Sequence, residues 1–217
     1  FDESKIKFNF NNIGLVWARR PYSSKWKTIN FAVGMNRLAN YHQELKYEGT
    51  STGSITDRFL ELAVGKSPSE LGAFEDGLAY DAYAIFEDDD NPGFYLSDFA
   101  YQEDVEKSQD IRRTGSINEL LVSFAGNYNE KLMIGATLGI PFVNFEETKT
   151  YREIDYDESN SVFDELSYVE RLTTTGAGLN LKLGAIYRVN QMVRVGAAVH
   201  TPTNFTLEDS WNNRMLY

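Results

Sequence analysis

Apolar and polar residues alternate on both sides of a short polar turn near the middle of the chain. The stripe before the turn is Leu120, Val122 and Phe124. The stripe after it consists of Leu132, Ile134, Ala136, Leu138, Ile140 and Phe142. Period-two alternation around a turn predicts an antiparallel β-hairpin. With a three-residue connection over 129-131, Tyr128 pairs with Leu132 and Phe124 lies opposite Ala136.

The two faces of this predicted hairpin differ in composition. One face is wholly apolar, and the other holds mainly Gly, Ala, Ser and Thr, with Glu119, Leu121 and Met133 as exceptions. The second face of a soluble β-sandwich would carry Lys, Glu and Arg in contact with water. A small-residue face opposite an apolar face favours the wall of a transmembrane β-barrel, with lipid outside and a lumen inside.

A second hairpin with the same pattern follows later in the chain. Its stripes are Leu179, Leu181, Leu183, Ala185 and Tyr187, then Val193, Val195, Ala197 and Val199. A three-residue turn over 189-191 predicts that Tyr187 lies opposite Val193 and that His200 lies opposite Asn180. Each first stripe ends in Tyr before its turn, which fits an aromatic girdle at a membrane interface. The alternative is an ordinary strand-end Tyr in a soluble β protein.

The whole chain reads as six antiparallel strands. They cover residues 5-20, 26-47, 115-128, 132-145, 173-188 and 192-207. A change of phase at Asn11-Asn12 predicts a β-bulge in the first strand. Six strands do not close a membrane barrel, and an open edge in lipid leaves backbone groups unpaired. We therefore expect further strands outside this sequence, and we expect 205-217 to begin another outer loop.

Short and long connections alternate between these strands. The short ones are 21-25, 129-131 and 189-191, and the long ones are 48-113 and 146-172. Consecutive antiparallel strands place alternate connections at opposite ends, so all the long loops share one end. Short periplasmic turns and long extracellular loops are typical of bacterial outer-membrane barrels.

The insertion 48-113 is predicted to be partly helical. Ser54-Ile55-Thr56-Asp57 opens a short helix, and Ser67-Pro68-Ser69-Glu70 forms a capping box with Pro at the first helical position. We expect one partial barrel domain over 1-217, with 48-113 and 146-172 as its two extracellular loops.

Charge is unevenly distributed along the chain. The net charge is -11, and segment 48-113 alone holds 16 Asp or Glu against five Lys or Arg. Segment 146-170 has nine acidic and two basic residues, which leaves the remainder of the chain at +7. The acidic loops repel phosphate and disfavour nucleic-acid binding. No apolar run of 18 residues occurs, so no transmembrane helix is expected.

Three segments resemble one family. They are Ile117-Asn118-Glu119-Leu120 with the hairpin that follows, Thr175-Gly176-Ala177-Gly178-Leu179 with the strand that follows, and 193-203. Together they resemble the FadL/TodX family of outer-membrane transporters of hydrophobic compounds. The resemblance covers residues 115-205 well and 5-47 loosely, and it extends to 48-113 only in position.

The resemblance implies a fourteen-stranded barrel plugged by an N-terminal hatch. It implies passive uptake of long-chain fatty acids or other hydrophobic small molecules across the outer membrane of a Gram-negative bacterium, among outer-membrane lipid and lipopolysaccharide. Ligands would bind near the outer loops and leave through a gap beside a kinked strand. We expect that kink near Gly34, since an inward-facing Gly permits it. The hatch segment of the family has no counterpart in this sequence.

Two groups of residues are candidates for ligand binding. The first lies on the apolar side of the insertion and comprises Phe59, Leu62, Phe74 and Leu78. Its members either pack against each other or form an apolar entry groove. The second group, Lys182, Arg194 and His200, falls on the small-residue face. These cations either hold a ligand carboxylate or pair with acids such as Glu119.

No catalytic motif stands out, and we expect no enzymatic activity, no cofactor and no metal site. Asp88-Asp89-Asp90 lacks the spacing of an EF-hand loop and predicts a solvated acidic turn. The absence of Cys excludes disulfides and thiolate metal sites. Two alternative functions stay open: a barrel that serves as a protein-handling subunit of a secretion system, and a surface β-domain without a transport role.

Overall fold

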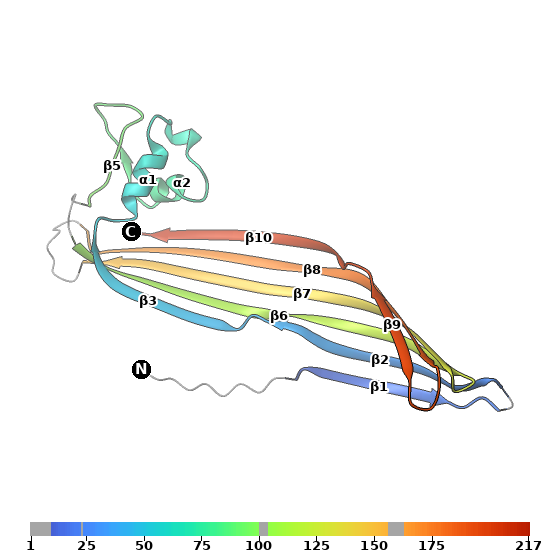
Figure 1. Cartoon of the computed structure of the whole chain (residues 1–217). Coiled ribbons are helices and arrows are strands. Elements are labelled where there is room, and N and C mark those ends of the chain that lie inside the picture. Colours follow the sequence, from blue (N-terminus) through green and yellow to red (C-terminus); the bar gives the residue numbers. More distant parts are fainter. Residues whose placement is uncertain (1–9, 23, 100–103, 156–162) are drawn as a thin grey trace. The chain divides into compact units, whose positions relative to one another are not determined.

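The computed structural model describes residues 10-22, 24-99, 104-155 and 163-217. They form a mostly β structure, an open antiparallel sheet of long strands with two short α-helices (Figure 1). The sheet strands are β1 (Asn12–Arg19), β2 (Trp26–Asn40), β3 (Gln43–Thr52), β6 (Asp104–Tyr128), β7 (Leu132–Ile154), β8 (Glu165–Arg188), β9 (Arg194–His200) and β10 (Asn204–Leu216). The insertion contains α1 (Thr56–Ala63), the 3-10 helix η1 (Pro68–Glu70), α2 (Asp76–Asp81) and the two-residue strands β4 (Phe86–Glu87) and β5 (Tyr95–Leu96).

The order of neighbouring strands is β1-β2-β6-β7-β8-β10, while β3 also pairs with β6 and β9 also pairs with β8. The chain divides into two compact units. Unit 1 comprises Phe1–Tyr41, Gly115–Phe145 and Thr174–Asp209, and unit 2 comprises His42–Thr114, Glu146–Thr173 and Ser210–Tyr217. No described helix is long and apolar enough to cross a membrane.

The central hairpin of unit 1 confirms the predicted connection. β6 ends at Tyr128 and β7 begins at Leu132, and the turn residues Asn129 and Glu130 have the left-handed φ values of 52° and 56°. The hydroxyls of Ser123 and Thr137 lie 2.8 Å apart, as the predicted register requires. Phe124 therefore shares a face with Ala136.

The second hairpin corrects the prediction. Tyr187 lies opposite Val195 rather than Val193, and His200 lies opposite Lys182 rather than Asn180. The connection is longer than three residues because the Asn190 side chain accepts hydrogen bonds from the backbone N–H groups of Met192 and Val193. This side-chain turn holds 189-193 out of the ladder and shifts the register by two residues.

One face of unit 1 is apolar across several strands, and none of the described residues covers it. Leu15 lies opposite Val33, which lies opposite Val122, so the stripes of β1, β2 and β6 continue into one another. The same face carries Phe124, which is 59% exposed, and Leu138, which is 38% exposed. Large apolar side chains thus stay exposed along several neighbouring strands of the sheet.

The predicted strand 26-47 is interrupted. It forms β2 and β3, separated by Tyr41 and His42, and its pairing with β6 shifts between Arg37 and Ala39. The kink expected near Gly34 is wrong, because Gly34 pairs regularly with Gly14 on one side and Leu121 on the other. The irregularity begins between Arg37 and Ala39, and beyond it the Tyr41 N–H donates to the carbonyl of Gly115 over 3.1 Å.

The strands extend further than the alternation predicted. β6, β7 and β8 continue into the segments expected to be loops, because their polar ends are also paired with neighbouring strands. For example, residues 43-52 of β3 pair with residues 113-104 of β6. Residues 205-216 of the expected loop belong to β10 instead. The expected strand 192-207 is broken at Thr201-Pro202-Thr203, since Pro has no N–H to donate. Residues 5-9 of the expected first strand, which precede the expected bulge at Asn11-Asn12, lie outside the described residues.

Gly115 holds a position that only glycine fits. Its φ is +117°, and a Cβ atom there would overlap the backbone of Asn144 and Phe145 in β7. Gly49 provides a matched control, since a Cβ there would meet nothing within 4 Å.

We predict that Gly115→Ala destabilises the protein by about 1–3 kcal/mol, the usual range for a strained backbone conformation, with the overlap adding to it. Gly49→Ala is expected to change the free energy of unfolding by about 0.5 kcal/mol or less. Urea unfolding, followed by tryptophan fluorescence, measures both. Equal effects of the two substitutions would contradict the close approach at Gly115.

Candidate functional site

A buried polar cluster lies on the small-residue face of unit 1. Glu119 of β6 is 1% exposed, and its carboxylate accepts hydrogen bonds from Asn180 Nδ2 over 2.8 Å and from Lys182 Nζ over 2.7 Å. Asn180 also donates to Thr203 Oγ1 over 3.2 Å. β6 and β8 therefore meet at the Glu119 carboxylate, and the segment before β10 is joined to them through Asn180.

This cluster decides between the two alternatives for Lys182. Its ammonium pairs with Glu119, so it is not a free cation awaiting a ligand. Of the other two predicted cations, His200 lies opposite Lys182 and Arg194 lies opposite Arg188 at the turn end of the hairpin. The three residues share one face, but only Lys182 reaches the carboxylate.

The cluster is tightly packed by small residues. A Cβ on Gly139 would collide with Glu119 Oε1 and with the Asn180 amide, so the glycine leaves the space that these side chains occupy. Asn180 Oδ1 is buried without a hydrogen-bond partner among the described residues. A buried carboxylate held by one ammonium and one amide is suited to fixing strand positions and to lining a polar interior.

Most predicted apolar residues of the insertion form a core. Phe59 is fully buried in a cluster that includes Val105 of β6 and Leu166 of β8, and its ring meets that of Tyr168 edge-on at 6.0 Å. Leu78 packs against the same cluster and Leu62 is half-buried. Phe59 and Leu78 thus secure the helices to the strands of unit 2.

Polar contacts fix the insertion to the same strands. Glu153 of β7 is fully buried, and its carboxylate accepts hydrogen bonds from the backbone N–H of Ile55 over 2.8 Å and from the hydroxyls of Ser54 and Tyr151. It thereby satisfies donors at the start of α1, the role of a helix cap. The carbonyl of Phe74 accepts a hydrogen bond from Tyr168 over 2.8 Å.

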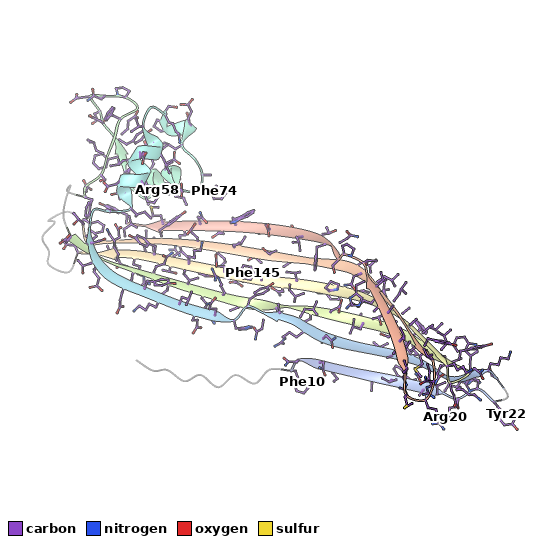
Figure 2. The ribbon with its side chains drawn as sticks, viewed as in Figure 1. Phe10, Arg20, Tyr22, Arg58, Phe74 and Phe145 are labelled. Carbon is purple, nitrogen blue, oxygen red and sulfur yellow. The ribbon has the colours of Figure 1, made fainter. Side chains whose placement is uncertain are left out.

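Phe74 is the predicted site residue that remains open. Its side chain is 56% exposed, and Figure 2 labels it in the insertion, next to the label of Arg58. Together with Trp211 of β10, which is 58% exposed, it lines a pocket of about 350 Å³ in unit 2. Small-molecule sites in proteins commonly have volumes of about 300–1,000 Å³. The remaining lining residues are Glu147, Lys149, Glu170, Arg171, Leu172 and Asn213.

The charges around this pocket are balanced. Lys149 lies 3.3 Å from Glu147, and Arg171 lies 3.6 Å from the half-exposed Glu146. Burial and the neighbouring carboxylates of Glu170 and Glu75 raise the pKa of Tyr168 to about 12. Two aromatic side chains beside paired charges suit an amphiphilic molecule whose apolar part contacts the rings.

Two acidic residues of the insertion, Asp76 and Asp88, form hydrogen bonds with groups close to them in the sequence. Burial alone would raise the pKa of Asp76, but hydrogen bonds from Lys66 and from the Gly72 N–H hold that pKa below its usual value. Asp88 accepts hydrogen bonds from the Asp90 N–H and the Asn91 side chain, which is the geometry of an ordinary polar turn. In the described part of the chain, no group of three or more His, Asp or Glu residues is placed to hold a metal ion.

Sequence reasoning missed Trp211, Asn213 and Glu153. The first two lie in the segment expected to be a loop, although Leu207 and Trp211 fall on alternate positions of a strand pattern. Glu153 lies in the second expected loop. No protein-family model, curated protein or solved structure matches the chain.

Removing the Glu119 side chain tests the polar cluster. We predict that Glu119→Ala costs about 2–4 kcal/mol, because it leaves the Lys182 ammonium and the Asn180 amide unpaired in a largely buried place. Glu146→Ala, which removes a half-exposed partner of Arg171, is expected to cost less than about 1 kcal/mol. Urea unfolding midpoints of both variants measure the difference. A Glu119→Ala cost equal to that of Glu146→Ala would show that the cluster contributes nothing special.

Proposed function

We propose that the chain forms part of the wall of an outer-membrane β-barrel that takes up hydrophobic small molecules passively, with long-chain fatty acids as the leading class. The observation that carries the proposal is the uncovered apolar face of unit 1. Leu138, Phe124 and their neighbours expose large side chains over several strands. Soluble monomers rarely leave such a continuous apolar surface in water. Contact with lipid acyl chains removes the conflict.

The opposite face supports the same proposal. It carries small residues, the hydroxyl pair of Ser123 and Thr137 and the buried Glu119–Lys182 ion pair. Charged groups in barrels of this kind face the lumen, where they find polar partners, and not the lipid. A wall with lipid on one side and a polar interior on the other accounts for both faces of unit 1.

The pocket of unit 2 is the proposed first contact with the transported molecule. Phe74 and Trp211 offer aromatic surface to the apolar part of such a molecule. The balanced charges admit a fatty-acid anion or a neutral compound, despite the acidic character of the insertion as a whole. The resemblance of 115-205 to the FadL/TodX family supports the same substrate class.

The lipid face is tested by paired arginine substitutions. We predict that Leu138→Arg costs about 2–4 kcal/mol in a bilayer, the usual cost of an arginine near the midplane on the lipid side. Thr137→Arg is expected to cost about 1 kcal/mol, chiefly for its lost hydrogen bond to Ser123. The folded fraction of full-length protein in lipid vesicles, read from heat-dependent gel mobility, measures both. Equal loss from both substitutions would reject the assignment of faces.

Ligand binding is tested at the pocket. We predict that Phe74→Ala combined with Trp211→Ala weakens binding of a long-chain fatty acid and of a neutral hydrophobic probe at least tenfold. Phe94→Ala, which removes a similarly exposed aromatic ring elsewhere in the insertion, is the control. Titration of the full-length protein in vesicles with a fluorescent fatty acid measures the affinity. Unchanged binding in the double variant would remove the pocket from the uptake route.

A further inference from the structure

A groove of about 550 Å³ lies on the exposed surface of unit 1, near its turn end. Its lining includes the side chains of Trp26, Ile29, Phe124, Ile134 and Leu183, around the small residue Ala136. Trp26 lies against Gly126, where a Cβ would collide with its indole ring, and its ring meets Tyr128 edge-on at 5.3 Å. The groove therefore has an aromatic wall on the side that faces the turns.

The turns beside this groove and the strand ends that flank them are strongly basic. They carry Arg19, Arg20, Lys25, Lys27, Lys131, Arg188 and Arg194, against the single acid Glu130. In the described part of the chain, no carboxylate forms an ion pair with any of these seven residues. This excess contrasts with the net charge of -11 for the chain.

Backbone contacts bring the basic turns together. The Asn129 N–H donates to the carbonyl of Lys25 over 2.7 Å, and the Arg188 N–H donates to the carbonyl of Lys131 over 2.8 Å. Arg188 in turn lies opposite Arg194. The cations thus form one band along the end of the sheet, and Figure 2 shows Arg20 and Tyr22 at the same end.

The band reaches the groove itself. Arg19 pairs with Ile29, a lining residue, so its position is on the apolar face and one strand away, about 5 Å between the two backbones. Lys27 precedes Ile29 by two residues, about 7 Å along the strand. The exposed cations Arg19 and Lys27 therefore lie beside the apolar groove, at distances that a lipid headgroup can span.

We propose that this groove and the basic band bind a phospholipid with an anionic headgroup. The acyl chain lies against Ala136 between Phe124 and Leu183, and the phosphate meets Arg19 and the turn lysines. Charge complementarity identifies the occupant, since a lipid without net charge gains little from the cations and a soluble anion gains nothing from the groove. The inference rests on the proposed membrane location, in which the short turns lie in the periplasmic leaflet.

The test uses full-length protein purified in detergent and native mass spectrometry to count retained lipids. Phosphatidylglycerol, phosphatidylcholine and lipopolysaccharide are offered separately at equal concentration. We expect at least fivefold higher occupancy by phosphatidylglycerol than by phosphatidylcholine, falling steeply as salt screens the charges. Equal occupancy by these two lipids overturns the proposal, and so does stronger retention of lipopolysaccharide at the same residues.

Two variants locate the site. Replacement of Arg19, Lys25 and Lys27 by Gln is expected to abolish the preference for phosphatidylglycerol, while Ala136→Phe fills the groove and lowers retention of both phospholipids at least fivefold. Lys46→Gln, an exposed cation of β3, is the control and is expected to change nothing. An effect of Lys46→Gln as large as that of the triple variant overturns the proposal.

A separate measurement distinguishes failure of this site from failure of the proposed function. Wild-type protein is mixed with vesicles of phosphatidylcholine alone, and its insertion is read from heat-dependent gel mobility. Insertion without a preference for phosphatidylglycerol overturns only the lipid site. Absence of insertion overturns the membrane location on which both proposals depend. The gel also verifies that each variant is folded before its lipid occupancy is compared.

Discussion

The register of the antiparallel ladder is the constraint on which the rest of unit 1 depends. Side chains alternate between the faces of a sheet, so a slip of one residue would exchange the two faces of a strand. The observed register stacks Trp17 on Phe31 at 5.5 Å and Phe31 against Phe124 at 4.9 Å, all on the apolar face. The same register brings Glu119 and Lys182 together on the other face. Segregation of apolar and polar groups and pairing of the buried charge therefore have one common cause.

The sequence predicted those parts of the fold in which alternation is strong and the turn is simple. The hairpin at 129-131 is such a case, because a wholly apolar stripe on each side leaves one good register. The hairpin after Tyr187 differs, since Asn190 uses its side chain to organise the turn and alternation carries no information about that bond. Strand ends were underestimated for a related reason: β3 and its partner in β6 are polar on both sides, so backbone pairing extends them without a hydrophobic signal.

Some residues of the candidate site could also be identified from the sequence, and others could not. Lys182 and its acid partner were recognisable because their positions fall on the small-residue face. Phe74 was recognisable as an apolar residue of the insertion, but nothing in the sequence separated it from Phe59, which is buried in the core. Only the packing of the helices against β6 and β8 makes that distinction. Trp211 was missed because the segment containing it continues as strand in a region that its acidic and polar residues marked as loop.

The cap that Glu153 places on α1 has a consequence for the order of folding. Ile55 and Glu153 are separated by 98 residues, and between them lie the rest of the insertion, all of β6 and most of β7. Loops of this length close slowly, because chain entropy is lost before the contact forms. We therefore expect the hydrogen bond from Ile55 to Glu153 to form later than the local contacts of the β6–β7 hairpin. The start of α1 consequently depends on a strand that the ribosome synthesises well after the helix itself.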